Sequence, residues 1–132
     1  MPRPRESARV IHRHAWLWEP LERDPRFLLR SMFGAKAAYL DGKLMLCFCA
    51  GEEPWRGLLV CTSRDHHAAL LANLPTLAPH PILPKWLYLP ETTGDFDRTA
   101  QHLVALALRR DPRIGVLPNP RKKKRAAAHR PR

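Results

Sequence analysis

The alternation of hydrophobic and polar positions in the middle of the chain predicts a β-hairpin. Asp41-Gly42 separates two apolar runs, and both residues tolerate the positive φ angles that a two-residue type I′ turn requires. This turn places Leu40 opposite Lys43, and residues that stand opposite each other share a face of the sheet. One face is then wholly apolar, and we assign it to the helices: Ala35, Ala37, Tyr39, Leu44, Leu46 and Phe48.

The other face of this hairpin is apolar in its middle and charged at its edge, so its apolar part needs a cover. The cover is either the N-terminal segment with Trp16 and Trp18 or a second subunit, because an exposed apolar face often marks an interface. The second alternative predicts a homodimer. Its candidate contact residues are Leu40, Met45, Cys47 and Cys49.

Two helices are predicted from apolar residues at helical spacing. The first covers residues 14–30 and turns at Asp24-Pro25, where Asp24 can act as an N-cap. The second follows Thr93 or Asp95 and ends at Asp111-Pro112. The apolar positions of this second helix are Phe96, Ala100, Leu103, Val104, Ala107 and Leu108.

The remaining segments complete an α+β pattern. Residues 58–62 and 85–89 predict two further strands, and Ser63 or Asp65 can cap a helix that continues to about Leu74. Prolines interrupt the connection over residues 75–84, which can therefore form neither a helix interior nor a central strand. The order α-β-β-β-α-β-α predicts a two-layer α+β fold, an antiparallel sheet of four to five strands with helices on one face.

Length and charge divide the chain into one domain with two basic ends. The 132 residues suit a single domain, and the net charge of +11 is concentrated outside its centre. Residues 1–14 carry four arginines against one glutamate, residues 121–132 carry seven basic and no acidic residues, and the remainder is nearly neutral at +1. We therefore expect a disordered N-terminus over residues 1–14, a domain over residues 15–112 and a disordered tail over residues 113–132.

The basic tail is the strongest candidate for a partner site. Its cations could neutralise nucleic-acid phosphates with little sequence preference, and because no aromatic residue follows Phe96, it offers charge without stacking. The alternative is a tail that only keeps the protein in solution. The candidate phosphate contacts are Arg121, Lys122, Lys123, Lys124 and Arg125.

The cysteines and histidines give little sign of catalysis. Cys47 and Cys49 share a strand face and could join one metal site, but structural zinc needs four ligands and no second pair exists. Cys61 and His66 could form a nucleophile pair only if the helix folds back beside the strand. We expect buried apolar thiols, no cofactor, no metal and no enzymatic activity. The absence of an apolar segment after the basic N-terminus predicts no secretory signal, so the expected location is the cytoplasm, with no membrane partner.

Three short motifs resemble the N-terminal domain of the TfoX family of bacterial competence regulators. They are Arg30-Ser31-Met32-Phe33-Gly34, Tyr39-Leu40-Asp41-Gly42-Lys43 and Lys85-Trp86-Leu87-Tyr88-Leu89-Pro90, and the resemblance spans roughly residues 16–110. It departs from the family at Ala35, where a second glycine is common. The resemblance implies a small two-layer domain with an α-β3-α-β-α core, similar to the secretion-chaperone-like fold, and no catalytic motif. The expected function is a non-catalytic bacterial interaction or regulatory module, and the alternative is a nucleic-acid-associated protein that acts through its tail.

Overall fold

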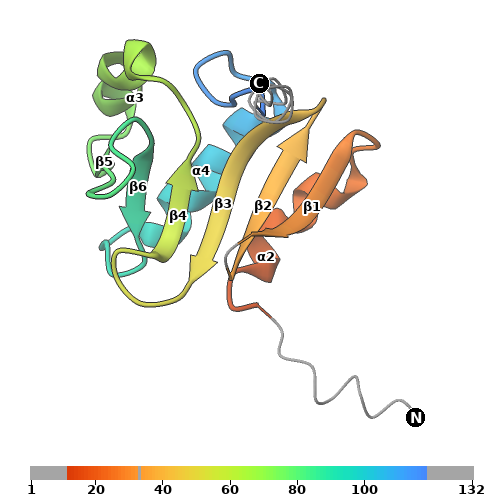
Figure 1. The fold of residues 1–132 in the computed structure, drawn as a ribbon, viewed down its shortest axis with the longest axis horizontal. Helices are drawn as coiled ribbons and strands as arrows, with labels where there is room; N and C mark the ends of the chain where they lie inside the picture. The colour runs from red at the N-terminus through yellow and green to blue at the C-terminus, as the bar shows by residue number, and fades with distance from the viewer. Residues whose placement is uncertain (1–11, 33, 119–132) are drawn as a thin grey trace, which may run out of the picture.

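Six strands form one antiparallel sheet in the order β1-β2-β3-β4-β6-β5, and helices pack against one side of it (Figure 1). The structure is a computed structural model that describes residues 12–32 and 34–118. It confirms the predicted two-layer α+β class. In chain order the elements are α2 (Ala15–Trp18), η1 (Glu19–Arg23), β1 (Phe27–Met32), β2 (Ala35–Leu40), β3 (Lys43–Ala50), β4 (Arg56–Val60), η2 (Arg64–His66), α3 (His67–Asn73), β5 (Ala78–Pro79), β6 (Leu87–Pro90) and α4 (Phe96–Leu108).

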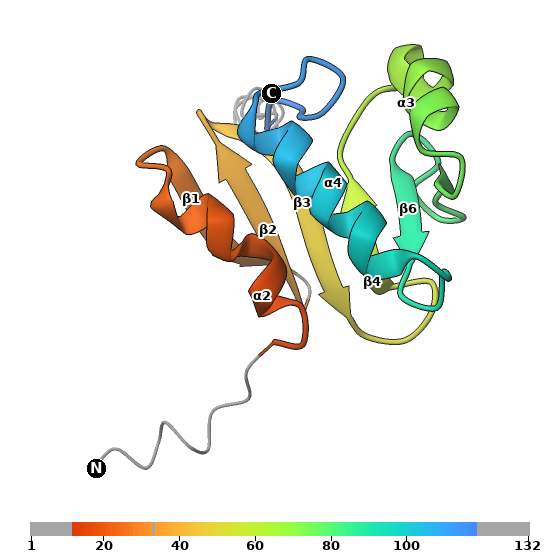
Figure 2. The ribbon, with the colours of Figure 1, turned by 180° about the vertical axis from the view of Figure 1, so that it is seen from behind.

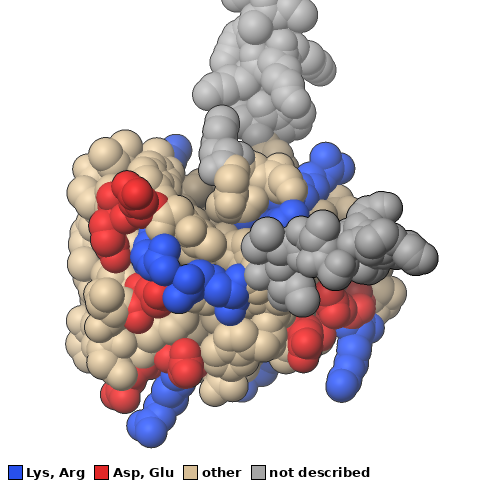
Figure 3. Space-filling view, turned by 90° about the horizontal axis from the view of Figure 1, so that it is seen from below, with Lys and Arg blue, Asp and Glu red and all other residues tan. Residues whose placement is uncertain are grey.

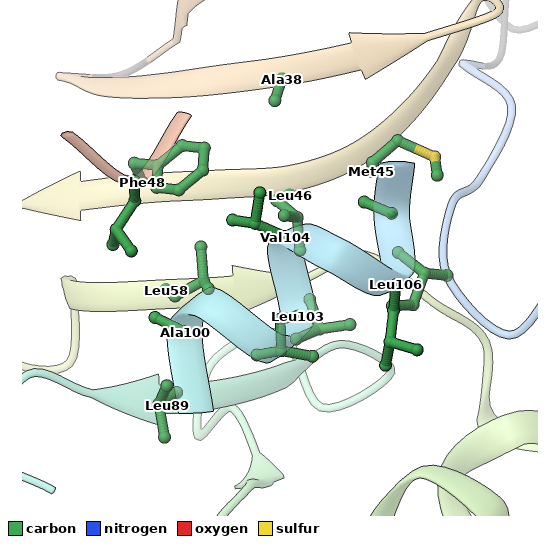
Figure 4. Close-up of a cluster of buried hydrophobic side chains, with 14 of the residues drawn as sticks. Ala38, Met45, Leu46, Phe48, Leu58, Leu89, Ala100, Leu103, Val104 and Leu106 are labelled. Carbon is green, nitrogen blue, oxygen red and sulfur yellow. The ribbon is translucent and has the colours of Figure 1, made fainter. Parts of the chain in front are cut away.

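The two faces of the sheet have different covers. Figure 2 shows α4 running diagonally across one face, with α2 beside it, whereas Figure 1 looks onto a face that no helix crosses. We call these the inner and the outer face. The inner face carries the larger cluster of buried side chains, in which Leu46, Phe48 and Leu58 of the sheet meet Ala100, Leu103 and Val104 of α4 (Figure 4).

The predicted hairpin is present, and a bulge changes its faces. Asp41 and Gly42 have φ angles of 55° and 80°, and Leu40 pairs with Lys43, as the type I′ turn requires. Beyond Tyr39, which pairs with Leu44, the register shifts by one residue, so that Ala38 pairs with Leu46. A bulge adds one residue to one strand and reverses the alternation of its side chains. Strict alternation from the Asp41-Gly42 turn predicts that Ala37 pairs with Leu46 and Ala35 with Phe48; this prediction is wrong, because Ala37 pairs with Cys47 and Lys36 with Phe48.

The bulge divides the four candidate contact residues of the predicted homodimer between the two faces of the sheet. Leu40 and Met45 lie in the inner cluster, and Figure 4 shows Met45 on the side of the sheet where α4 lies. Cys47 and Cys49 lie in the separate outer cluster. Conversely, part of the face assigned to the helices belongs to the outer cluster: Ala35, Ala37, Tyr39 and Leu44.

The predicted helix over residues 14–30 is wrong over most of its length. Only Ala15–Trp18 forms an α-helix, the chain continues as the 3₁₀ helix η1, and Phe27–Met32 is the edge strand β1. Pro20 lies in η1, and a proline cannot donate the backbone hydrogen bond that an α-helix interior needs. Asp24 is not an N-cap: it follows the end of η1 and accepts a hydrogen bond from the Arg26 amide at 2.9 Å.

The predicted closing helix is confirmed as α4, and its C-terminus has a defined geometry. The Asp111 amide donates to the Leu106 carbonyl at 3.0 Å and the Arg110 amide to the Ala107 carbonyl at 2.9 Å, which together form a Schellman motif. Arg110 occupies the position that favours glycine and has a φ of 56°. Its guanidinium donates to Asp24 at 2.7 Å and to Asp41 at 2.8 Å. One side chain thus joins the end of α4 to the residues just before β1 and just after β2, at the open end of this hairpin.

The ordered fold extends beyond both predicted boundaries. At the C-terminal end, Ile114 is buried in the inner cluster, and Val116 exchanges two backbone hydrogen bonds with Leu44 of β3, at 2.8 and 3.0 Å. At the N-terminal end, His14 is buried. The predicted limits at residues 14 and 112 therefore excluded parts of the packed domain. The short strand β5, within the proline-rich connection, was also missed, and it lies at the sheet edge where a proline is tolerated.

Candidate functional site

The outer face holds a pocket of about 620 Å³, which is the candidate functional site. Strands β1 to β4 supply seven of the described lining residues: Met32, Ala35, Leu44, Cys47, Cys49, Ala50 and Leu59. The other five come from the connections around them: Gly34, Gly51, Trp55, Leu83 and Trp86. We call this space the outer pocket. Every described residue that lines it is uncharged.

The bulge in β3 supplies the floor of the outer pocket. Because the bulge reverses the alternation, Cys47 and Cys49 turn away from α4 and join Leu44 and Leu59 on the outer face. All four side chains are between 1% and 7% exposed. The floor is therefore recessed below the connections that form the walls.

Buried His80 connects two walls of the outer pocket. Its Nδ1 accepts hydrogen bonds from the amides of Ile82 and Leu83, both at 3.0 Å. Nδ1 therefore carries no proton, so Nε2 is the protonated nitrogen and donates to the Pro54 carbonyl at 2.6 Å. The ring also packs on Trp55 with centroids 4.3 Å apart. One imidazole thus fixes the segment before Trp55 against the segment that carries Leu83.

Tyr88 reinforces the same junction from β6. Its ring lies edge-on to His80, with centroids 5.0 Å apart, and its hydroxyl oxygen accepts the Arg56 amide at 2.9 Å. The hydroxyl also lies 2.8 Å from a carboxylate oxygen of Glu53, to which it can donate. Burial raises the pKa of this phenol, so the hydroxyl stays protonated and available as a donor.

Burial keeps two of the three cysteines, Cys49 and Cys61, as neutral thiols in the folded protein. The Sγ atoms of Cys47 and Cys61 lie 3.9 Å apart, and all three cysteines are buried and free. Burial raises the pKa of Cys49 to about 12 and that of Cys61 well above its usual value. Because the thiolate is the nucleophile, these groups have little reactivity at neutral pH. The hypothetical Cys61–His66 pair has no hydrogen bond within the described part of the chain.

Metal ligation has no site within residues 12–32 and 34–118, where no three His, Cys, Asp or Glu side chains are arranged to hold an ion. The shared strand face of Cys47 and Cys49 was read correctly from the sequence, since both lie in the outer cluster. Their neighbours are apolar side chains and the thiol of Cys61.

A second hollow, of about 550 Å³, lies at the start of α4 and has a mixed lining of acids and bases. In it the Glu91 carboxylate is 2.8 Å from Arg13 and 3.2 Å from Arg56. His14 Nε2 is 3.3 Å from the same carboxylate, within ion-pair distance but without hydrogen-bond geometry. Burial lowers the pKa of His14, which favours the neutral ring. The Glu91 carboxylate here is already paired with Arg13 and Arg56, and the outer pocket is the larger of the two and has a uniformly uncharged lining, so it is the better candidate for a ligand.

The sequence located part of the outer pocket and missed the rest. Cys47 and Cys49 were predicted on a face in need of a cover, and they form its floor. Leu40 and Met45 were predicted beside them and belong to the inner core. Trp55 and Leu83 had no sequence signal, and the motif that contains Trp86 did not indicate a pocket, because these residues come together only through His80 and the pairing of β4 with β6. The tail residues Arg121 to Arg125 lie outside the described residues.

The described surface has no dominant charge. In Figure 3, basic and acidic side chains lie next to each other on the face shown, and neither sign covers it. This agrees with the near neutrality of residues 15–120 in the sequence. A phosphate-binding patch on this face of the domain has no support.

Comparisons of the chain with family models, with curated proteins and with solved structures gave no match. The resemblance to the TfoX N-terminal domain therefore rests on the three sequence motifs. Met32, Gly34 and Trp86 belong to these motifs, and all three line the outer pocket. Within the described ranges, every helix is too short or too polar to span a lipid bilayer.

Proposed function

We propose that this protein is a non-catalytic binding module whose outer pocket holds a small, uncharged, largely apolar molecule. The observation that carries the proposal is the outer pocket itself, about 620 Å³ in volume and lined by uncharged side chains. This volume falls within the range of known small-molecule sites, roughly 300–1,000 Å³, which are mostly apolar and few per protein. Ligand binding would be the means by which a regulatory module of the TfoX-like kind, acting in the cytoplasm, responds to its surroundings.

The shape of the pocket favours a small molecule over a second copy of the chain. A stable dimer buries about 800 Å² on each partner. The floor residues Cys47, Cys49 and Leu59 are already at most 3% exposed, so a flat partner surface would gain little area from them. A molecule that enters the recess can contact the floor and the walls together.

The lining also favours a neutral ligand. A charged group that leaves water for an apolar site loses several kcal/mol or more unless an opposite charge meets it. No charged residue lines the described pocket, and the Cys49 thiol on its floor is protonated, so it supplies no negative charge. The protonated Cys49 thiol also supports a non-catalytic role, since a protonated thiol is not an activated nucleophile.

Isothermal titration with 2-naphthol, a neutral bicyclic probe, tests this proposal. We expect saturable binding to one site with a dissociation constant on the order of 100 µM, from the typical affinity per heavy atom of small ligands. Filling the pocket through Ala35→Phe or Ala50→Phe should weaken binding at least tenfold. The matched control Ala105→Phe, exposed on α4 on the other side of the sheet, should bind like the wild type.

Circular dichroism of each variant confirms that it is folded before its affinity is compared. If both folded pocket variants bind 2-naphthol as well as Ala105→Phe does, the probe occupies another part of the molecule and the proposal is wrong. Absence of any saturable binding to the wild type contradicts it equally.

A second candidate function follows from charge alone. The last twelve residues carry seven cations beside a nearly neutral domain, and we propose that this tail can hold nucleic acid through its phosphates. If the five cations Arg121 to Arg125 each neutralise one phosphate, the logarithm of the association constant for duplex DNA should fall with the logarithm of the salt concentration with a slope of about −4 to −5. Deletion of residues 119–132 should abolish this binding. The control replaces Ala126, Ala127 and Ala128 by serine, which keeps every charge. Equal binding by the deletion variant would exclude this function.

A further inference from the structure

We infer that the molecule held in the outer pocket is a planar aromatic ring system rather than an aliphatic one. This inference rests on the proposed binding function and adds the chemical class of the ligand. It follows from three features of the lining: its sulfur atoms, its tryptophans and its small residues.

Three sulfur-bearing side chains line the outer pocket. Cys47 and Cys49 form part of the floor, and Met32 stands at the end of β1 beside it. Divalent sulfur makes favourable contacts with aromatic rings, typically with the sulfur about 5 Å from the ring. An aliphatic molecule of the same size would bury the same area without this additional attraction.

Two tryptophans add aromatic surface to the walls. Trp55 and Trp86 flank β4 and β6, and both line the pocket. Trp55 is 37% exposed, so its indole still has surface to offer, and its ring is already packed on His80. Aromatic pairs in stacked or edge-to-face geometry gain stability beyond that expected from buried area. Because His80 already holds the Trp55 indole on one side, this side chain loses little conformational entropy when a ligand ring packs against it.

Small residues leave room for a flat molecule. Gly34, Ala35, Ala50 and Gly51 all line the pocket, and none extends beyond a Cβ atom. A Cβ atom placed on Gly34 would meet no heavy atom within 4 Å, so the space above this residue is open. Ala35 and Ala50 at the ends of β2 and β3, with the two glycines in the turns beside them, leave a shallow space that matches the face of a planar ring better than the irregular outline of a branched chain.

Occupation by a second copy or by a charged ligand would require features that the described pocket lacks. The recessed floor gives a flat protein surface little area, and no lining residue can pair with a charge. The remaining choice is between aromatic and saturated neutral molecules. The sulfur atoms and the tryptophans favour the aromatic class.

The experiment compares 2-naphthol with decahydro-2-naphthol, which has the same carbon skeleton and hydroxyl group but no aromatic ring. We expect 2-naphthol to bind the full-length protein at least tenfold more tightly in isothermal titration. The variant Met32→Leu keeps the apolar contact, removes one sulfur and should reduce this preference. The control Met45→Leu removes a sulfur from the inner face and should leave the preference unchanged.

The outcomes separate the two proposals. If both compounds bind at the same pocket with equal affinity, or the saturated one binds more tightly, the aromatic inference is overturned and the binding function stands. If neither compound binds, the binding function itself fails and the inference falls with it. Tighter binding of 2-naphthol that weakens in Met32→Leu, but not in Met45→Leu, supports both.

Discussion

The inner and outer faces of the sheet differ in packing although the same strands build both. On the inner face, Leu46 and Phe48 are fully buried beneath α4, and the space is filled by side chains. On the outer face, Cys47 and Cys49 alternate with them along β3, are buried almost as deeply, and border a pocket of about 620 Å³. A side chain can therefore be buried while the space next to it stays empty, as Cys47 and Cys49 show. The first face is built for stability and the second leaves room for a ligand.

The largest expected effect concerns the thiols, because all three cysteines lie on the outer face. Burial moves the pKa of Cys49 from 9.0 to about 12, which lowers its thiolate fraction near pH 8 about a thousandfold. We expect this thiol to react with a disulfide reagent correspondingly more slowly in the folded protein than in denaturant. Absorbance of the released thiolate measures both rates, and a rapid reaction of Cys49 in the native state would show that the floor is open to water.

Packing on the two faces can be compared through one leucine on each. Leu103→Ala, beneath α4, should lower the free energy of unfolding by about 3–5 kcal/mol, because it leaves a cavity in a filled core. Leu59→Ala, on the pocket floor, should cost about 2 kcal/mol, because part of its surroundings is already empty. Urea denaturation gives both values. Equal losses would mean that the two faces are equally well packed.

The junction between the helix layer and the sheet can be tested at Arg110. Its positive φ favours glycine, whereas its guanidinium binds Asp24 and Asp41. Arg110→Ala loses the ion pairs and keeps the backbone strain, and Arg110→Gly loses the ion pairs and relieves it. We expect the alanine variant to be less stable than the glycine variant by about 1 kcal/mol in thermal denaturation. If the glycine variant were the less stable of the two, the backbone at residue 110 would carry no strain.

The smallest expected effect is a dependence of stability on pH. Burial lowers the pKa values of His12 and His14, so the unfolded chain binds protons first and stability falls as the pH drops below about 6.5. A second fall should follow below about pH 4, because hydrogen bonding to Arg113 lowers the pKa of Asp111 to about 2. Urea denaturation at a series of pH values measures both. His14→Gln should flatten only the first decline.

Much of the inner layer could be predicted from the sequence because its signals are local. The Asp41-Gly42 turn depends on two adjacent residues, and α4 shows its periodicity within thirteen residues. The α+β class follows from the order of these elements. None of these inferences needs knowledge of a distant contact.

The outer pocket could not be predicted because it depends on non-local geometry. A single bulge in β3 decides which side Met45 and Cys47 face, and strict alternation gives the wrong answer for Met45. The walls depend on His80, which joins Pro54 to Leu83 across a long separation in sequence. The edge strand β1 was missed because its residues Phe27, Leu28 and Leu29 are all apolar and show no alternation.

The pairing of Val116 with Leu44 ties the last part of the described chain to β3. Leu44 lines the outer pocket, and Arg121, the first of the tail cations, is only five residues beyond Val116. Five residues span at most about 18 Å, which limits the distance between the Cα atoms of Val116 and Arg121. For any partner that engages both, a tether of this length corresponds to an effective concentration of about millimolar. Two weak contacts, one apolar and one ionic, would then combine into a single stronger one.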